Sequence, residues 1–186
     1  MYLIEKHYQN LVQDDLILSQ GQAYTNPHQI PRMKKVNLLC PNEGGKTGWK
    51  DVLPTLGLLD FLGLQKAYLV RSKKSSPHLQ ISKGEVVASK QSLRGQHMYT
   101  FLHKLIFEAM PKLRNFSPLP IPKHPNTYSF QLQEIFAFDE LTSLYISLEK
   151  ISTLHIDFNI QSTTSSEVHY LLQSLQVCIE GKSPKN

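Results

Sequence analysis

Basic and hydroxyl side chains gather in one part of this sequence, residues 66–94. The segment holds seven lysines and arginines and a single acid, Glu85, which gives it a formal net charge of +6. Such cations bind phosphates and release counterions, and serine hydroxyls hold position on phosphate and ribose oxygens. Two tracts, 71–76 and 90–95, have no aromatic side chains on which single-stranded bases could stack. The pattern predicts a non-catalytic protein that binds a folded RNA helix.

The second half of the sequence has the opposite charge. Residues 128–180 contain seven acids against Lys150, which gives a formal net charge of −6. This asymmetry indicates one face for a polyanion and another face turned away from it. Two solvated faces, with the basic segment as a solvated hairpin, are the alternative that charge alone leaves open.

One motif could be interpreted as a nucleotide site. Gly45-Lys46-Thr47 stands between an expected strand and an expected helix, as a phosphate-binding loop does. The pattern requires a glycine where Cys40 stands, and Pro41 removes a backbone donor. A glycine-rich turn is therefore the preferred interpretation, and a nucleotide-binding protein that uses these residues is kept as the alternative function. We expect no catalytic residues and no cofactor.

Metal, disulfide and membrane signals are also weak. The eight histidines lack the spacings of metal sites, so we expect no metal. Cys40 and Cys178 are predicted to be small buried side chains in a reducing compartment. No run of about 18 apolar residues is present, so no membrane span is expected.

Apolar spacing and the positions of Pro and Gly divide the chain into elements. The predicted helices span residues 2–18 (within an N-terminal helical region 2–20), 49–64, 95–110 and a last helix capped by Ser165 or Ser166. The predicted strands span residues 36–40, 67–70 and 86–93, and alternation indicates two more around 128–132 and 154–160.

Particular side chains are expected to face the core. In the first helix these are Ile4, Tyr8, Leu11 and Val12; in the second, Val52, Leu53, Leu56 and Leu59, with Pro54 in the first turn; in the third, which Pro111 ends, Met98, Phe101, Leu102, Leu105 and Ile106; in the last, Val168, Leu171, Leu172 and Leu175.

These elements predict an α+β fold in one domain, residues 1–180, followed by a short tail, 181–186. The sheet is expected to be mostly antiparallel and open, with helices packed on one face. A basic hairpin arm, residues 72–83, should protrude from it. The other face of the sheet is then left for a partner.

Four stretches of the sequence resemble one protein family. They are Ile30–Val36, Arg71–Lys74, Ser92–Leu102 and Ala109–Phe116, whose order and spacing agree with the family's motifs. The chain resembles the bacterial-type "L-five" family of large-subunit ribosomal proteins, over about residues 1–179. The combination is specific, although any one stretch alone would be weak.

The resemblance implies a role at the central protuberance of the large ribosomal subunit. Its implied partners are 5S rRNA and large-subunit rRNA, the P-site tRNA, a neighbouring 5S-binding ribosomal protein, and a small-subunit head protein reached through an inter-subunit bridge. The implied RNA-binding residues are Arg32, Lys35, Arg71, Lys73, Lys74, Lys90, Ser92 and Arg94. The arm residues implied to contact tRNA are Ser75, Ser76, His78, Gln80 and Lys83.

The sequence also departs from the family pattern. Leu39 stands where the family has an RNA-contacting Asn, and the arm lacks one of the family's cations at 80–84. Such drift, with a start at Met1 and no presequence, is typical of an organelle-encoded mitochondrial ribosomal protein. A plastid or the bacterial cytoplasm is the alternative location. A protein-interaction module using Phe136 and Phe138 is a further alternative function.

Overall fold

The computed structural model describes residues 3–19, 24, 26–42, 49–78, 81–114, 117–149, 151 and 153–180. Its centre is a five-stranded sheet in the order β2-β3-β1-β5-β4, with every neighbouring pair antiparallel. The strands are β1 Arg32–Pro41, β2 Tyr68–Arg71, β3 Val86–Leu93, β4 Thr127–Leu132 and β5 Leu154–Gln161. The predicted α+β fold with an antiparallel open sheet is confirmed.

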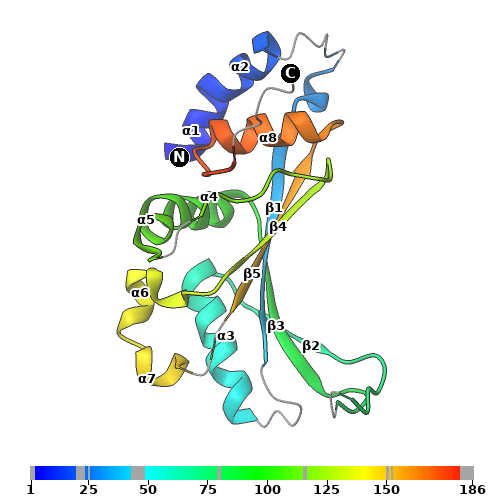
Figure 1. Cartoon of the computed structure of the whole chain (residues 1–186), viewed down its shortest axis with the longest axis vertical. Helices are drawn as coiled ribbons and strands as arrows, with labels where there is room; N and C mark the ends of the chain where they lie inside the picture. Colours follow the sequence, from blue (N-terminus) through cyan, green and yellow to red (C-terminus); the bar gives the residue numbers. More distant parts are fainter. Residues whose placement is uncertain are drawn as a thin grey trace.

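Helices pack against this sheet and connect its strands. The α-helical segments are α1 Leu3–His7, α2 Gln13–Ser19, α3 Trp49–Gly63, α4 Gly95–His103, α5 Met110–Lys112, α6 Asp139–Thr142, α7 Tyr145–Leu148 and α8 Ser165–Ser174. Figure 1 shows α3, α4, α6 and α7 on one side of the strands, whereas the other side of the strands carries no described helix. This arrangement leaves one sheet face open, as the sequence predicts.

The alternating strands β4 and β5 form as expected. Every second side chain of β5 is buried beneath the helices, and the intervening ones are half-buried on the open face. In β4, Tyr128 and Leu132 are buried and Phe130 is half-buried. The rings of Phe130 and Phe158 meet edge-on with centroids 5.5 Å apart, so the two strands share one apolar cluster.

The N-terminal helix contains a wider turn than expected. Between α1 and α2, residues Tyr8–Val12 form a π-helical turn, and the buried positions recur every four residues. The buried side chains are Ile4, Tyr8, Val12 and Leu16. Leu11 is 55% exposed, so its predicted place in the core is wrong. The extra residue in the wide turn rotates Leu11 away from the buried stripe.

Strand β1 and helix α3 differ from their predicted forms. β1 spans ten residues, begins four residues before its predicted start, and ends at Pro41, which pairs with Ala88. In α3 the side chain of Leu53 is 61% exposed, so its predicted burial is wrong. Pro54 is the sixth residue of the helix as described, in the second turn and not the first.

The helix that begins at Gly95 extends past its predicted end. Its predicted core residues are all buried: Met98, Phe101, Leu102, Leu105 and Ile106. A π-helical segment, Lys104–Ala109, leads into α5, and Pro111 lies inside α5 instead of stopping the helix. A wide turn already lacks the regular backbone hydrogen bonds, which lets a proline follow it at low cost.

Helix α8 is capped by Thr164 and not by Ser165 or Ser166. The Thr164 hydroxyl accepts a hydrogen bond of 3.3 Å from the backbone N–H of Glu167, and the Glu167 carboxylate accepts one from the backbone N–H of Thr164. This is a reciprocal capping box. The predicted core residues of this helix, Val168, Leu171, Leu172 and Leu175, are all buried.

Two further predictions about single residues are corrected. Cys40 is buried as expected, but Cys178 is exposed. It follows α8, and its carbonyl accepts a hydrogen bond of 3.0 Å from the backbone N–H of Leu119, in the segment between α5 and β4. Phe138 is 1% exposed and packs on Phe101, so it cannot belong to a protein-binding surface.

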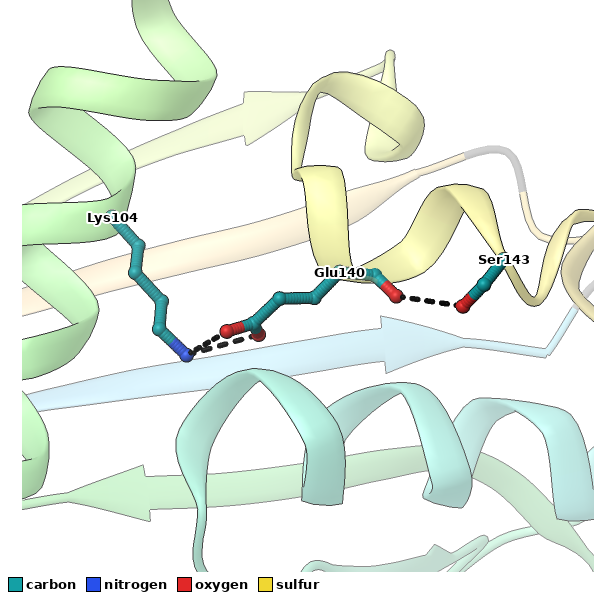
Figure 2. A network of polar contacts seen from close by, with 3 residues as sticks. All are labelled: Lys104, Glu140 and Ser143. Atoms are coloured by element: carbon teal, nitrogen blue, oxygen red, sulfur yellow. Dashed lines mark hydrogen bonds and ion pairs between the residues drawn. The ribbon is translucent and has the colours of Figure 1, made fainter.

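A polar network fastens the helices to one another on the covered side. Figure 2 shows the Lys104 ammonium group reaching the carboxylate of Glu140 in α6. Its nitrogen lies 2.8 Å from Oε1, and the Ser143 hydroxyl donates to the Glu140 carbonyl at 3.3 Å. The Lys104 side chain is 11% exposed, so this ion pair lies partly out of water. It holds α6 against the π-helical segment that follows α4.

Candidate nucleic-acid interface

The register of the strands decides which side chains share the open face. Successive residues of a strand point to opposite faces, and directly paired residues lie on the same face. Because alternate residues of β1 and β5 are buried under the helices, the others face outward. The outward set is Lys35, Asn37 and Leu39 of β1; Lys90 and Ser92 of β3; His155, Asp157 and Asn159 of β5; and Thr127, Ser129 and Gln131 of β4.

A bulge in β1 brings two predicted RNA-binding residues to this face together. The register between β1 and β5 shifts between Met33 and Lys35. Arg32 therefore pairs with Gln161 and Lys35 pairs with Asn159, both on the outward side of β5. The Arg32 Nε donates a hydrogen bond of 3.3 Å to the Gln161 side chain, which holds the guanidinium over the strand ends.

A third cation joins them from the end of β3. Arg94 is exposed and follows β3 directly, and Gly95 then turns the chain into α4 with φ +55°, a conformation that side chains disfavour. Arg32, Lys35 and Arg94 all line one groove of about 920 Å³ between the N-terminal helix, β1 and α4. The sequence places them 62 residues apart at the extremes, and the fold brings them to one site.

The two tyrosine side chains that line the groove carry no negative charge. Tyr8 and Tyr99 also line it, and burial raises the pKa of both hydroxyls above the usual value of 10.0. The Tyr8 hydroxyl donates a hydrogen bond of 2.9 Å to the carbonyl of Pro31. Both phenols are therefore neutral at physiological pH and add no negative charge beside the four cations that line the groove, Arg32, Lys34, Lys35 and Arg94.

Polar contacts hold β3 against α3. The hydroxyls of Thr55 and Ser89 lie 2.7 Å apart in the interior, and the Gln91 amide donates to the carbonyl of Gln65. A Cβ atom at Gly63 would overlap the side chains of Gln91 and Leu93, so any larger residue there requires these two buried side chains to shift. These contacts on the covered side hold β3 in place, and thereby position Lys90 and Ser92, which alternate with Ser89 and Gln91 and face the open side.

The basic arm continues the hairpin of β2 and β3, as the sequence predicts. Beyond β2 and β3, the backbones of Ser76 and Ile81 exchange hydrogen bonds of 2.9 and 3.2 Å. The arm's acid, Glu85, accepts a hydrogen bond from the Ser82 backbone at 2.8 Å. The carboxylate is thereby held by the backbone, and the cations of the arm remain exposed around it.

The predicted site residues therefore fall into two groups. The first group lies on the sheet and its groove: Arg32, Lys35, Lys90, Ser92 and Arg94. The second lies on the arm or its base: Arg71, Lys73, Lys74, Ser75, Ser76, His78 and Lys83. Gln80 and the Gly45-Lys46-Thr47 motif lie outside the described residues.

The sequence reasoning missed several outward polar residues of the sheet. Asn37 accepts a hydrogen bond of 2.8 Å from the Ser92 hydroxyl, and Gln131 lies 3.2 Å from the ring nitrogen Nδ1 of His155. On β5, Asp157 pairs with Asn37, and Asn159 pairs with Lys35. The signal was present, because the polar positions of residues 154–161 alternate with the buried ones.

Comparison with known proteins decides the family. The family model for the C-terminus of the ribosomal L5 proteins matches residues 86–178, half of the chain. The chain belongs to the uL5 family of large-subunit ribosomal proteins. The match begins at β3 and ends after α8, so it contains Lys90, Ser92 and Arg94.

Relatives in the uL5 family cover nearly the whole chain. The "Large ribosomal subunit protein uL5m" of Reclinomonas americana is 29% identical over 95% of this chain and 97% of its own. The uL5c of Mesostigma viride is 33% identical over 86% and 87%, and the uL5 of Thermosipho africanus is 30% identical over 91% and 93%. The chain is thus a structural component of the large ribosomal subunit and not an enzyme.

No three His, Cys, Asp or Glu side chains in the described part gather as metal ligands would. Within the same residues, no helix combines the length and the apolar character needed to cross a bilayer.

Proposed function

We propose that this uL5-family chain binds 5S rRNA at the central protuberance through the open face of its sheet. One observation carries the proposal: Arg32, Lys35, Lys90 and Arg94 share that face, and no ion pair among the described residues neutralises them. Solvent-accessible, unpaired cations on one surface favour a polyanion. Large-subunit rRNA around the site is the expected second partner.

The arm is proposed to contact the P-site tRNA. Lys73, Lys74 and Lys83 are exposed, and Ser75 and His78 add hydrogen-bonding groups between them. Figure 1 shows the ribbon of β2 and β3 diverging from α3 at one end of the sheet. A projecting ribbon with exposed cations can reach a phosphate backbone while the sheet stays fixed on rRNA.

The neighbours and the compartment complete the proposal. A neighbouring 5S-binding protein and a small-subunit head protein are the expected protein partners. A mitochondrial ribosome is the expected location, because the relative from Reclinomonas is named uL5m and covers this chain almost fully. The uL5c relatives make a plastid the competing location.

A gel-shift series tests the central part. Purified chain should bind 5S rRNA at low salt and co-sediment with large subunits. Arg94→Ala should weaken 5S binding by about tenfold. Arg114→Ala removes the same charge from an exposed residue after α5 and should change affinity by less than about twofold. Equal losses, or no 5S binding by the wild type, would overturn the proposal.

A further inference from the structure

A row of four side chains, three of them uncharged and one acidic, crosses the middle of the open face. The register pairs Ser92 with Asn37, Asn37 with Asp157, and Asp157 with Ser129. The row therefore runs across β3, β1, β5 and β4, at right angles to the strands. Paired residues on one face lie close enough for their side chains to act together on a ligand.

Asp157 is the unusual member of the row. It is half-buried, and its carboxylate makes no hydrogen bond or ion pair with another described residue, although its backbone belongs to the sheet. An ionised carboxylate is only an acceptor, with room for several hydrogen bonds. If RNA covered this face without offering donors, the carboxylate would lose its water and gain nothing, at a large cost in affinity.

The cations stand on both sides of the row and not within it. Lys35 lies one pleat repeat away toward the groove with Arg32 and Arg94, and Lys90 lies one repeat away toward the arm. One repeat of two residues is about 7 Å along a strand. Phosphates are attracted to these flanks, and the Asp157 carboxylate repels them from the centre.

We propose that the row Ser92–Asn37–Asp157–Ser129 reads hydrogen-bond donors in the shallow groove of an RNA helix, with Asp157 as the acceptor. This inference rests on the proposed binding of RNA by the open face. The shallow groove of A-form RNA displays ribose 2′-hydroxyls and the 2-amino group of guanine, both of which are donors. A sheet face suits this wide groove, and the flanking cations then meet the two phosphate backbones.

The hydrogen bond from Ser92 prepares the row for this role. The Ser92 hydroxyl donates to Oδ1 of Asn37 at 2.8 Å, which directs the amide N–H groups of Asn37 away from β3. Asn37 thereby offers donors to acceptor atoms in the same groove. Ser129 at the other end is exposed and can donate or accept.

The test compares Asp157→Asn with Glu149→Gln, an exposed residue after α7 whose replacement changes the net charge equally. The probes are 5S rRNA and a DNA duplex, which carries phosphates but no 2′-hydroxyls. Asp157→Asn should weaken 5S binding by about tenfold and leave DNA binding unchanged or tighter. Glu149→Gln should change neither by more than about twofold. Ser129→Ala gives a second, milder loss at an exposed position where folding is not at risk.

Interference mapping distinguishes the two kinds of donor, the ribose 2′-hydroxyl and the guanine 2-amino group. It also distinguishes a failure of the proposed row from a failure of the proposed function. With wild-type protein, 5S transcripts carrying inosine or 2′-deoxy analogues should show positions that impair binding. Those positions should disappear with Asp157→Asn: inosine positions indicate the guanine amino group, and 2′-deoxy positions the ribose. A preference for 5S that Asp157→Asn leaves intact overturns the row alone. A wild type that binds 5S no better than DNA overturns the proposed function itself.

Discussion

The hydroxyl of Ser92 on β3 donates a hydrogen bond of 2.8 Å to the side-chain carbonyl of Asn37 on β1. Ser92→Ala leaves that oxygen without its partner on a residue that is 8% exposed, and should lower the free energy of unfolding by about 1–2 kcal/mol. Ser92→Thr keeps the hydroxyl and should stay close to wild type. Urea unfolding measures the stability of both variants. Equal stabilities for the Ala and Thr variants would contradict a stabilising hydrogen bond between Ser92 and Asn37.

Gly63 sets the approach of α3 to β3. A Cβ at Gly63 would overlap the buried Gln91 and Leu93 side chains, whereas nothing lies within 4 Å of a Cβ at Gly57. Gly63→Ala should therefore destabilise the fold by about 1–3 kcal/mol through overpacking. Gly57→Ala on the same helix should stabilise it by up to about 1 kcal/mol. Thermal or urea unfolding of the pair is decisive, and a neutral Gly63→Ala would contradict this packing.

Thr164 begins α8 through its capping box. Thr164→Ala should cost about 1 kcal/mol of stability, because the side-chain acceptor for the Glu167 N–H is lost. Ser165→Ala, one residue later, should fall within about 0.5 kcal/mol of wild type. Urea unfolding of the two variants measures both losses, and the reverse order would reassign the cap.

Tyr128 should make the fold sensitive to alkaline pH. Burial, with a smaller contribution from the Glu180 carboxylate, raises the pKa of its phenol to about 12. The raised value favours the neutral form in the folded state. Its stabilising contribution is full below pH 10 and is lost as pH rises toward 12.

The matched variant is Tyr128→Phe. It loses the hydrogen bond of 2.8 Å to the Pro120 carbonyl, so it should be less stable than wild type at neutral pH. The gap between the two proteins should shrink between pH 10 and 12, as followed by urea midpoints. A gap that stays constant over that range would show that Tyr128 does not titrate as described.

Much of the fold could be predicted because periodicity reports burial. The alternation of Leu154, Ile156 and Phe158 indicated β5, and the spacing of Met98, Phe101 and Leu102 indicated α4. The start of β1 at Arg32 could not be predicted from the sequence. The bulge between Met33 and Lys35 breaks the alternation, so that Arg32 and Lys35, three residues apart, both face outward. Leu11 failed because a π-helical turn changes the period locally.

The candidate site was harder to predict than the fold. Basic residues near 71–94 stand out in the sequence, but the groove that unites Arg32 with Arg94 depends on pairing between distant strands. Asn37 and Asp157 become neighbours only through the register of β1 and β5. The Thr164 cap, by contrast, was readable, since Glu167 stands three residues after Thr164 as a capping box requires.

The salt dependence of 5S rRNA binding tests the central claim most directly. If Arg32, Lys35 and Arg94 contact phosphates, their triple replacement by Ala should reduce the slope of log affinity against log salt by about 2–3. Replacing Lys6, Lys112 and Arg114, which are exposed elsewhere, removes the same charge and should leave the slope near the wild-type value. Equal slopes for the two triple variants would contradict the open face as the RNA-binding surface.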